Sequence, residues 1–167
     1  LTAAVLLSLA ACSTAAKTDR ADETPAAEQT QTDNTQIPNP WADYDSLDEA
    51  IAAAGFDCTI PDTIGGCSEK AFRVLDADGE TMLEVIYADG ETEIARVRKA
   101  PGTEDISGDY NAYDAQDVAV GDVTVTMKSA DGLVKLAIWQ DGGYTYAVSV
   151  EAGCSADAMA ELVSQIG

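Results

Sequence analysis

Short turn signals that contain glycine recur between residues 78 and 143, and they constrain the fold of this chain more than any other feature. Each suits a tight hairpin, because glycine adopts the positive φ angles that such turns need. The residues between the turns alternate in polarity, as Val123, Val125 and Met127 do with their polar neighbours, and this predicts half-buried antiparallel strands. The turn signals are Asp78-Gly79, Asp89-Gly90, Gly121-Asp122, Asp131-Gly132 and Asp141-Gly142-Gly143. The expected strands are 57–60, 69–76, 82–88, 92–99, 117–120, 123–129, 133–139 and 144–151.

A helix is expected on each side of this strand-rich region. Ser46 followed by Glu49 forms a capping box, and Gly55 provides a C-terminal stop, which predicts a helix at 47–54. Ser155 is the expected N-cap of a second helix at 156–166, whose apolar residues recur at helical spacing. Together these patterns predict an α+β fold: a curved antiparallel β-meander with a short N-terminal helix and a C-terminal helix packed on it.

The first residues of the chain match the pattern of a lipoprotein signal peptide. Leu1 to Leu9 is almost wholly apolar, but it is too short to span a bilayer as a stable helix. It ends in Leu9-Ala10-Ala11-Cys12, the lipobox pattern, in which the cysteine thiol accepts a diacylglyceryl group. We expect residues 1–12 to be this signal, truncated at its N-terminus because a basic segment and a start Met are missing. An ordinary secretory signal with a chance cysteine is the alternative.

Two further segments follow the lipobox. Residues 13–40 have one aliphatic side chain larger than alanine, Ile37, and bury too little apolar surface to offset chain ordering. They are predicted to form a disordered, acidic and polar tether. Residues 41–167 are predicted to form the extracytoplasmic α+β domain, with 25 acidic and seven basic residues. Trp41, its first residue, is interpreted as core or edge packing.

The composition excludes several classes of function. Of the 167 residues, 30 are Asp or Glu and 9 are Lys or Arg, which gives a net charge of −21, and none is His. Ser-His-Asp catalysis, Cys-His catalysis and His-ligated metal sites are therefore unavailable within this chain. The acidity argues against binding nucleic acid, whose phosphates demand Lys and Arg. We expect no metal site and no cofactor. We interpret the EF-hand-like run at 76–80 as a hairpin turn, because it lacks the third ligand before the glycine and the distal bidentate Glu of an EF-hand.

Three cysteines remain in the expected domain, and export permits a disulfide. Cys58 and Cys67 flank a short turn and could face each other on adjacent strands. Because three is odd, at least one thiol must be free or shared. A Cys58–Cys67 disulfide and free thiols at both positions remain open alternatives, and Cys154 is expected to be a buried free thiol.

The most distinctive stretch for binding is residues 96–113. It gathers three of the seven basic residues of the expected domain and then runs through a long loop with two tyrosines, and loops of this length are often functional. One interpretation is a binding groove with cationic and aromatic walls. The other is internal pairing of Arg98 or Lys99 with a loop carboxylate, which would hold the loop on the sheet. The candidate residues are Arg96, Arg98, Lys99, Glu104, Asp105, Asp109, Tyr110 and Tyr113.

Several short motifs resemble an uncharacterised bacterial lipoprotein family, the domain of unknown function numbered 4367. The fairly specific one runs from Arg98-Lys99-Ala100 to Glu104-Asp105-Ile106-Ser107-Gly108-Asp109-Tyr110-Asn111; the weaker ones are Asn39-Pro40-Trp41, Ala54-Gly55-Phe56, Ala137-Ile138-Trp139 and Gly143-Tyr144-Thr145-Tyr146. The resemblance covers about 39–167. Such domains occur on Gram-positive surface lipoproteins and on extracytoplasmic parts of anti-sigma-factor-like proteins. The resemblance implies an envelope location and a sensing or binding role, and it assigns no catalytic residues.

These observations predict a non-enzymatic binding or interaction domain on the outer face of the cell membrane. The membrane is the expected partner through a lipid at Cys12, and the domain is expected to bind an envelope protein or a small ligand. One alternative is an accessory envelope sensor for a membrane signalling, anti-sigma-like partner. The other is a small hydrolase that uses two carboxylates, although the sequence singles out no such pair.

Overall fold

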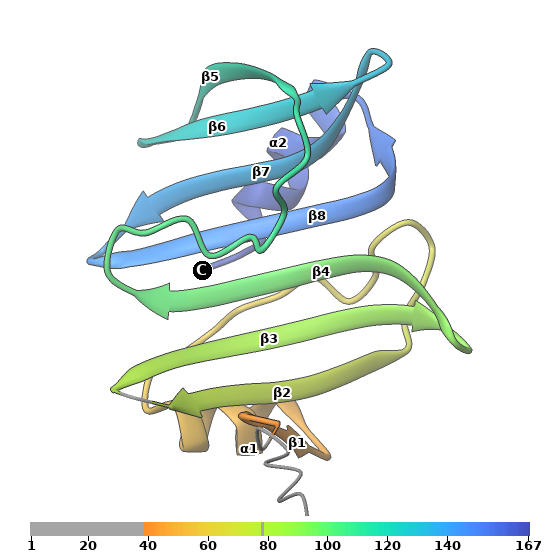
Figure 1. Cartoon of the computed structure of the whole chain (residues 1–167). Helices are drawn as coiled ribbons and strands as arrows, with labels where there is room; N and C mark the ends of the chain where they lie inside the picture. The colour runs from red at the N-terminus through yellow and green to blue at the C-terminus, as the bar shows by residue number, and fades with distance from the viewer. Residues whose placement is uncertain (1–38, 78) are drawn as a thin grey trace, which may run out of the picture. The chain divides into compact units, whose positions relative to one another are not determined.

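The structure is a computed structural model that describes residues 39–77 and 79–167 (Figure 1). The predicted signal peptide, its Cys12 and all but the end of the predicted tether lie outside the described residues. No helix in the described ranges is long and apolar enough to cross a membrane. The elements, in chain order, are β1 (Trp41–Tyr44), α1 (Leu47–Ala54), β2 (Lys70–Ala77), β3 (Glu80–Asp89), β4 (Thr92–Pro101), β5 (Asp114–Val120), β6 (Val123–Ala130), β7 (Leu133–Asp141), β8 (Tyr144–Cys154) and α2 (Ala156–Ser164).

All eight strands form one antiparallel sheet in the order β1-β2-β3-β4-β8-β7-β6-β5. Strands β1 to β4 make one meander and β5 to β8 make a second, and the two meanders join where β4 pairs with β8, with Val97 opposite Val148. Residues 102–113, the connecting loop, run from β4 to β5 across the front of the sheet in Figure 1. The expected α+β fold with an open, curved antiparallel sheet is therefore confirmed, with two meanders in place of one.

Among the residues that the structure describes, four two-residue hairpin loops connect neighbouring strands at glycine signals of the sequence, and Gly79 precedes β3 in the β2–β3 connection. The loop between β6 and β7 shows the reason: Asp131 has φ 54° and Gly132 has φ 79°. Two successive positive φ values define the turn whose twist matches the twist of the flanking strands. Local turn chemistry thus fixes the lengths and the pairing of most strands.

Both helices begin at the residues that the sequence predicts. Ser46 Oγ accepts a hydrogen bond from the backbone N–H of Glu49 at 3.3 Å, and Gly55 ends α1 in the left-handed conformation with φ 79°. Ser155 Oγ accepts from the backbone N–H of Ala158 at 3.2 Å, and α2 ends at Ser164, two residues before the predicted boundary. Helix α1 lies next to β1, β2 and β3, and α2 lies next to β5, β7 and β8.

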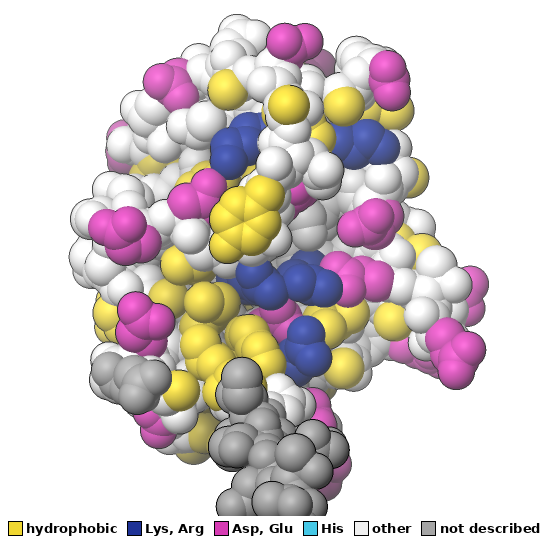
Figure 2. Space-filling model, viewed as in Figure 1, with side chains coloured by type: hydrophobic (Ala, Val, Ile, Leu, Met, Phe, Trp, Pro, Cys, Tyr) yellow, Lys and Arg dark blue, Asp and Glu magenta, His cyan; other side chains and the backbone are white. Residues whose placement is uncertain are grey.

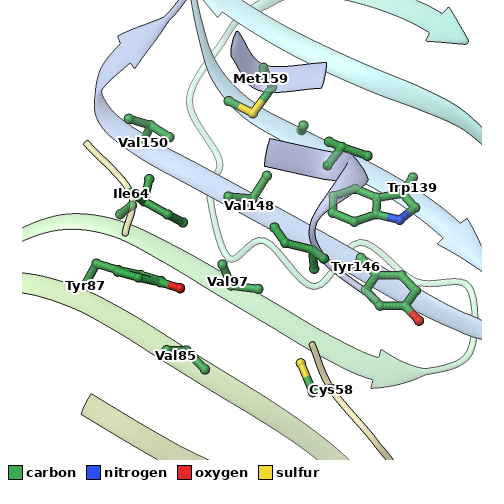
Figure 3. Packing of buried hydrophobic residues seen from close by; sticks show 14 of the residues in the cluster. Cys58, Ile64, Val85, Tyr87, Val97, Trp139, Tyr146, Val148, Val150 and Met159 are labelled. Atoms are coloured by element: carbon green, nitrogen blue, oxygen red, sulfur yellow. The ribbon is translucent and has the colours of Figure 1, made fainter. Parts of the chain in front are cut away.

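The core lies between the helices and the face of the sheet that they share, called the helix face (Figure 3). Val85, Val97 and Val148 line its centre on three adjacent strands. Trp139 and Tyr146 stack with ring centroids 5.1 Å apart and an interplanar angle of 5°. Burial of these alternate residues stabilises the sheet by removing apolar surface from water.

Two predicted features of the N-terminal part differ in the structure. Residues 57–60 are not a strand; they cross the helix face, where the backbone of Thr59 exchanges two hydrogen bonds with Gly167, with N···O distances of 2.6 and 3.2 Å. Strand β1 was not expected, because its four residues lack an alternating pattern and their order depends on pairing with β2. Both differences arise from long-range contacts.

Candidate functional site

Three arginines and one glutamate converge on the sheet face opposite the helices, which the connecting loop crosses and which we call the loop face. The strand register puts Arg73 of β2 opposite Glu84 of β3, and Glu84 opposite Arg98 of β4. Arg96 lies two residues before Arg98 on the same strand and so points to the same face. Arg73, Arg96 and Arg98 are called the arginine cluster below.

Glu84 is fully buried at the centre of this cluster. Its Oε1 atom accepts a hydrogen bond from Arg73 Nε, and Nε and Nη2 of Arg98 both lie 2.6 Å from its Oε2 atom. Arg96 Nη1 is 3.6 Å from the same oxygen, while Arg96 Nη2 binds Glu93 at 2.5 Å. A buried carboxylate needs such partners, because an unpaired one would carry a large desolvation cost.

Trp41, at the edge of the sheet, packs against two arginines of this cluster. Its ring lies 4.9 Å from the guanidinium carbon of Arg73 and 5.9 Å from that of Arg98, within the range of cation–π attraction. Trp41 therefore packs at the edge of the sheet, against charged groups. The residue that follows the predicted tether directly is thus in contact with the arginine cluster.

Arg98 also holds the connecting loop on the sheet. Its Nη1 atom donates hydrogen bonds to the backbone carbonyls of Ile106 and Ser107, at 2.9 and 2.7 Å. Gly108 packs so closely that an added Cβ atom would lie 2.6 Å from the same Nη1 atom. A second attachment is the ion pair between Lys128 Nζ and Asp105 Oδ2 at 3.0 Å.

These contacts correct the predicted pairing within residues 96–113. The loop is held on the sheet, but Arg98 binds its backbone carbonyls and Glu84 instead of Glu104, Asp105 or Asp109. Lys99 belongs to the other side of the sheet. Its Nζ atom donates to the carbonyl of Asp57 at 2.6 Å among the rings of Phe56, Tyr144 and Tyr146.

Hydrogen bonds within the loop stabilise two of its carboxylates. Asp109 accepts from Asn111 and from the Tyr113 hydroxyl, the latter at 2.7 Å. Burial acts to raise the pKa of Asp109, but these hydrogen bonds outweigh it and hold the pKa below its usual value. At Asp105, burial also acts to raise the pKa. Hydrogen bonds from Ser107 and Lys128 outweigh it, so this pKa too lies below its usual value. Both groups therefore stay ionised near neutral pH.

A polar hollow of about 440 Å³, open to solvent, lies between the loop and the sheet. Tyr110 stands at its rim with 97% of its surface exposed, and Glu151 and Ser149 of β8 lie across from the loop. Figure 2 shows Lys and Arg side chains gathered on this face among hydrophobic and acidic ones. Glu104 is exposed and lines a separate, more apolar hollow with Met82 and Ile106. The geometry offers an exposed aromatic ring beside polar and charged groups.

The cysteines of the described residues are free thiols, so the structure contains no Cys58–Cys67 disulfide. Cys58 is buried in the core, where burial raises its pKa to about 11. Cys67 points elsewhere and donates to the carbonyl of Ala88 at 3.0 Å. Cys154 is a free thiol as expected, but it is only partly buried, which corrects the expected burial.

Within the described ranges, no group of three or more His, Cys, Asp or Glu side chains is arranged to hold a metal ion. The EF-hand-like run at 76–80 falls in the β2–β3 hairpin, and Asp78 lies outside the described residues.

Comparisons with family models, curated proteins and solved structures find no match to this chain. The resemblance to the lipoprotein family numbered 4367 therefore stays a prediction.

Sequence reasoning did not identify Glu84 or Arg73 as part of the site. The available signal was a single charged residue in the apolar run Met82-Leu83-Glu84-Val85-Ile86. A charge at such a position needs an ionic partner, but which strand supplies it depends on a register that the sequence does not state.

Proposed function

We propose that this chain is a lipid-anchored extracytoplasmic protein whose folded domain binds another molecule through the loop face, without catalysis. The anchor rests on the Leu9-Ala10-Ala11-Cys12 motif of the sequence. In this proposal the helices pack on the helix face and stabilise the sheet, so that the opposite face and its connecting loop are free to bind.

The observation that carries the binding role is the way Arg98 fixes the loop. Because Arg98 bonds two consecutive carbonyls, the loop is ordered before any ligand arrives. Tyr110 is then presented, almost fully exposed, beside the polar hollow. Ordering in advance lowers the entropic cost of binding, and tyrosine is enriched at energetically important interface positions.

The lowered pKa values of two loop carboxylates make these two groups unsuited to act as the acid of a carboxylate hydrolase. A carboxylate hydrolase needs a carboxyl group that stays protonated near neutral pH, which requires a raised pKa. The pKa values of Asp105 and Asp109, two carboxyl groups of the connecting loop, are instead lowered. They are suited to structural or electrostatic roles.

An accessory sensor for a membrane signalling partner is the second candidate function. Trp41 contacts Arg73 and Arg98, and Arg98 in turn contacts the loop. A ligand that displaced the loop would therefore disturb the residue next to the predicted tether. This series of contacts favours the sensor over the carboxylate hydrolase. The resemblance to the lipoprotein family also favours a sensing role.

The anchor and the binding face are tested separately. Cys12→Ser is expected to release the protein from the membrane fraction, and retention of that variant would contradict the anchor. For binding, lipidated protein is used to capture partners from the native envelope, with Tyr110→Ala as the test and Leu133→Ala, which alters an exposed apolar side chain on β7, as the control. We expect Tyr110→Ala alone to lose capture; identical capture by both variants would contradict the loop face.

A further inference from the structure

The outer edge of β5 is a second surface that the loop-face proposal does not use. This strand of seven residues ends the sheet, with β6 as its partner on one side. Residues 114–117 and Ala119 are exposed, while Val118 and Val120 are partly buried. An edge strand presents unpaired backbone N–H and C=O groups, which form a template for another strand.

The hairpin geometry identifies which backbone groups are unpaired. Val120 and Val123 close the two-residue β5–β6 loop as opposite residues, and such a closing pair exchanges hydrogen bonds. Bonding then alternates along the strand, so residues 114, 116, 118 and 120 bond to β6. The backbone N–H and C=O groups of Ala115, Asp117 and Ala119 consequently point away from the sheet.

The side chains of β5 indicate the chemistry of a strand that would fit there. Asp117 is exposed on the loop-face side, where one of its oxygens accepts from Thr126 Oγ1 at 2.8 Å. Val118 and Val120 lie on the helix-face side and pack against the margin of the core. A complementary strand would place Lys or Arg opposite Asp117 and apolar side chains next to the valines.

A second copy of this chain fits the edge poorly. Full antiparallel overlap of two β5 strands would centre on residue 117 and put Asp117 opposite the same residue of the other copy. Like charges in directly opposite positions are destabilising. The folded domain also carries 25 acidic and seven basic residues, so two copies repel each other.

We propose that the β5 edge binds an extended segment of a partner protein in which basic and apolar residues alternate, by adding that segment to the sheet as a ninth strand. Backbone hydrogen bonds to residues 115, 117 and 119 supply the affinity, and Asp117 supplies the preference for basic residues. The site is separate from Tyr110 and its hollow, so the two proposals succeed or fail independently.

The test uses the full chain and a synthetic peptide of alternating lysine and valine with the length of β5, seven residues. Binding is followed by fluorescence anisotropy and by amide hydrogen exchange. We expect the peptide to slow exchange at 115, 117 and 119 by about tenfold or more, with little change at 114, 116 and 118, whose amides already bond to β6. A peptide of alternating glutamate and valine should bind more weakly.

Two matched variants separate strand addition from general attraction to an acidic protein. Ala119→Pro removes one outward N–H, keeps every charge and is compatible with an edge strand, whereas Ala119→Thr keeps the N–H. We expect Ala119→Pro to weaken peptide binding about tenfold and Ala119→Thr to leave it unchanged. Circular dichroism checks that both variants fold.

The proposal is overturned if the peptide binds Ala119→Pro as tightly as the unaltered chain, or if it fails to slow exchange at the three outward amides. The latter result would mean that Asp117 serves only to block the edge. Dimerisation of the chain through β5, seen as exchange protection that depends on protein concentration without peptide, would equally overturn it.

Discussion

Glu84 and Arg98 are directly opposite each other on β3 and β4, and two nitrogens of Arg98 lie 2.6 Å from a single oxygen of Glu84. The remaining guanidinium nitrogen of Arg98, Nη1, binds the connecting loop. One arginine thus links a fully buried carboxylate to the backbone of the candidate binding loop. The stability of the sheet and the position of the loop depend on the same side chain.

Glu84→Gln is predicted to destabilise the domain strongly, because it removes the negative charge that three arginines share. Loss of one partner from a buried ion pair costs about 3–5 kcal/mol. Glu93→Gln is the matched control, because its pair with Arg96 is more exposed and should contribute less than about 1 kcal/mol. Urea unfolding measures both, and equal losses would contradict the central role of Glu84.

Gly108→Ala is predicted to loosen the connecting loop. Gly108 has φ 66°, and an added Cβ would lie 2.6 Å from Arg98 Nη1, so the substitution combines backbone strain with displacement of Arg98. Gly90→Ala is the control, because Gly90 has φ 61° and open space around its Cβ position. We expect faster hydrogen exchange in the first variant alone at the loop amides that donate hydrogen bonds, Ser107 to Asp105 and Asn111 to Asp109; similar exchange in both would show that Arg98 does not hold the loop.

Local sequence signals predicted most elements of this fold. Helix α1 begins after the Ser46 cap and ends before Gly55, as expected. Seven of the strands begin and end within a few residues of the positions that the glycine turns predict. Local sequence did not predict the segments whose structure depends on distant residues. Strand β1 depends on pairing with β2, and residues 57–60 bond to the end of the chain. The crossing of the sheet by residues 102–113 also had no local signature.

The candidate site was predicted in part. Residues 96–113 were identified, but Arg98 and Lys99 were grouped together as partners for the loop. Successive residues of a strand point to opposite faces, so these two neighbours cannot share a site once 92–99 is interpreted as a strand. That argument was available from the sequence, whereas the pairing of Glu84 with three arginines required the register of β2, β3 and β4.

The attachment of the loop at Asp105 is predicted to weaken in acid. The folded pKa of Asp105 lies below its usual value of 3.8, so its contribution is present above that pH and is lost as the pH falls through the folded pKa. Lys128→Met removes the hydrogen bond and charge that help to lower this pKa. NMR titration should then show the Asp105 pKa rising towards 3.8; an unchanged pKa would mean that Lys128 does not bind it in solution.

Cys58 is predicted to be unreactive while the domain is folded. Its side chain is buried and its pKa is raised to about 11 by burial, so little thiolate exists near neutral pH. Alkylation followed by mass spectrometry at pH near 8 should modify Cys58 only after unfolding. Protection of Cys58 that disappears on reduction would indicate a disulfide and contradict the free thiols of the structure.

Lys99→Met is predicted to destabilise the domain although it replaces a buried charge with an apolar side chain. Lys99 is 6% exposed; its Nζ atom bonds to the Asp57 carbonyl and lies 4.7 Å and 4.9 Å from the centroids of the Tyr144 and Tyr146 rings. Methionine fills similar space but leaves that carbonyl unpaired and removes the cation–π attraction, at a cost of about 1–3 kcal/mol.

Lys70→Met is the matched control for Lys99, because Lys70 also donates to a carbonyl and lies over a tyrosine ring, but it is more exposed. Water can replace its lost contacts, so the expected loss is below about 1 kcal/mol. Thermal and urea unfolding measure the loss of stability in both variants. If Lys99→Met unfolds no more easily than Lys70→Met, the aromatic surroundings of Lys99 do not stabilise its charge, and apolar packing alone holds residues 56–57 against the sheet.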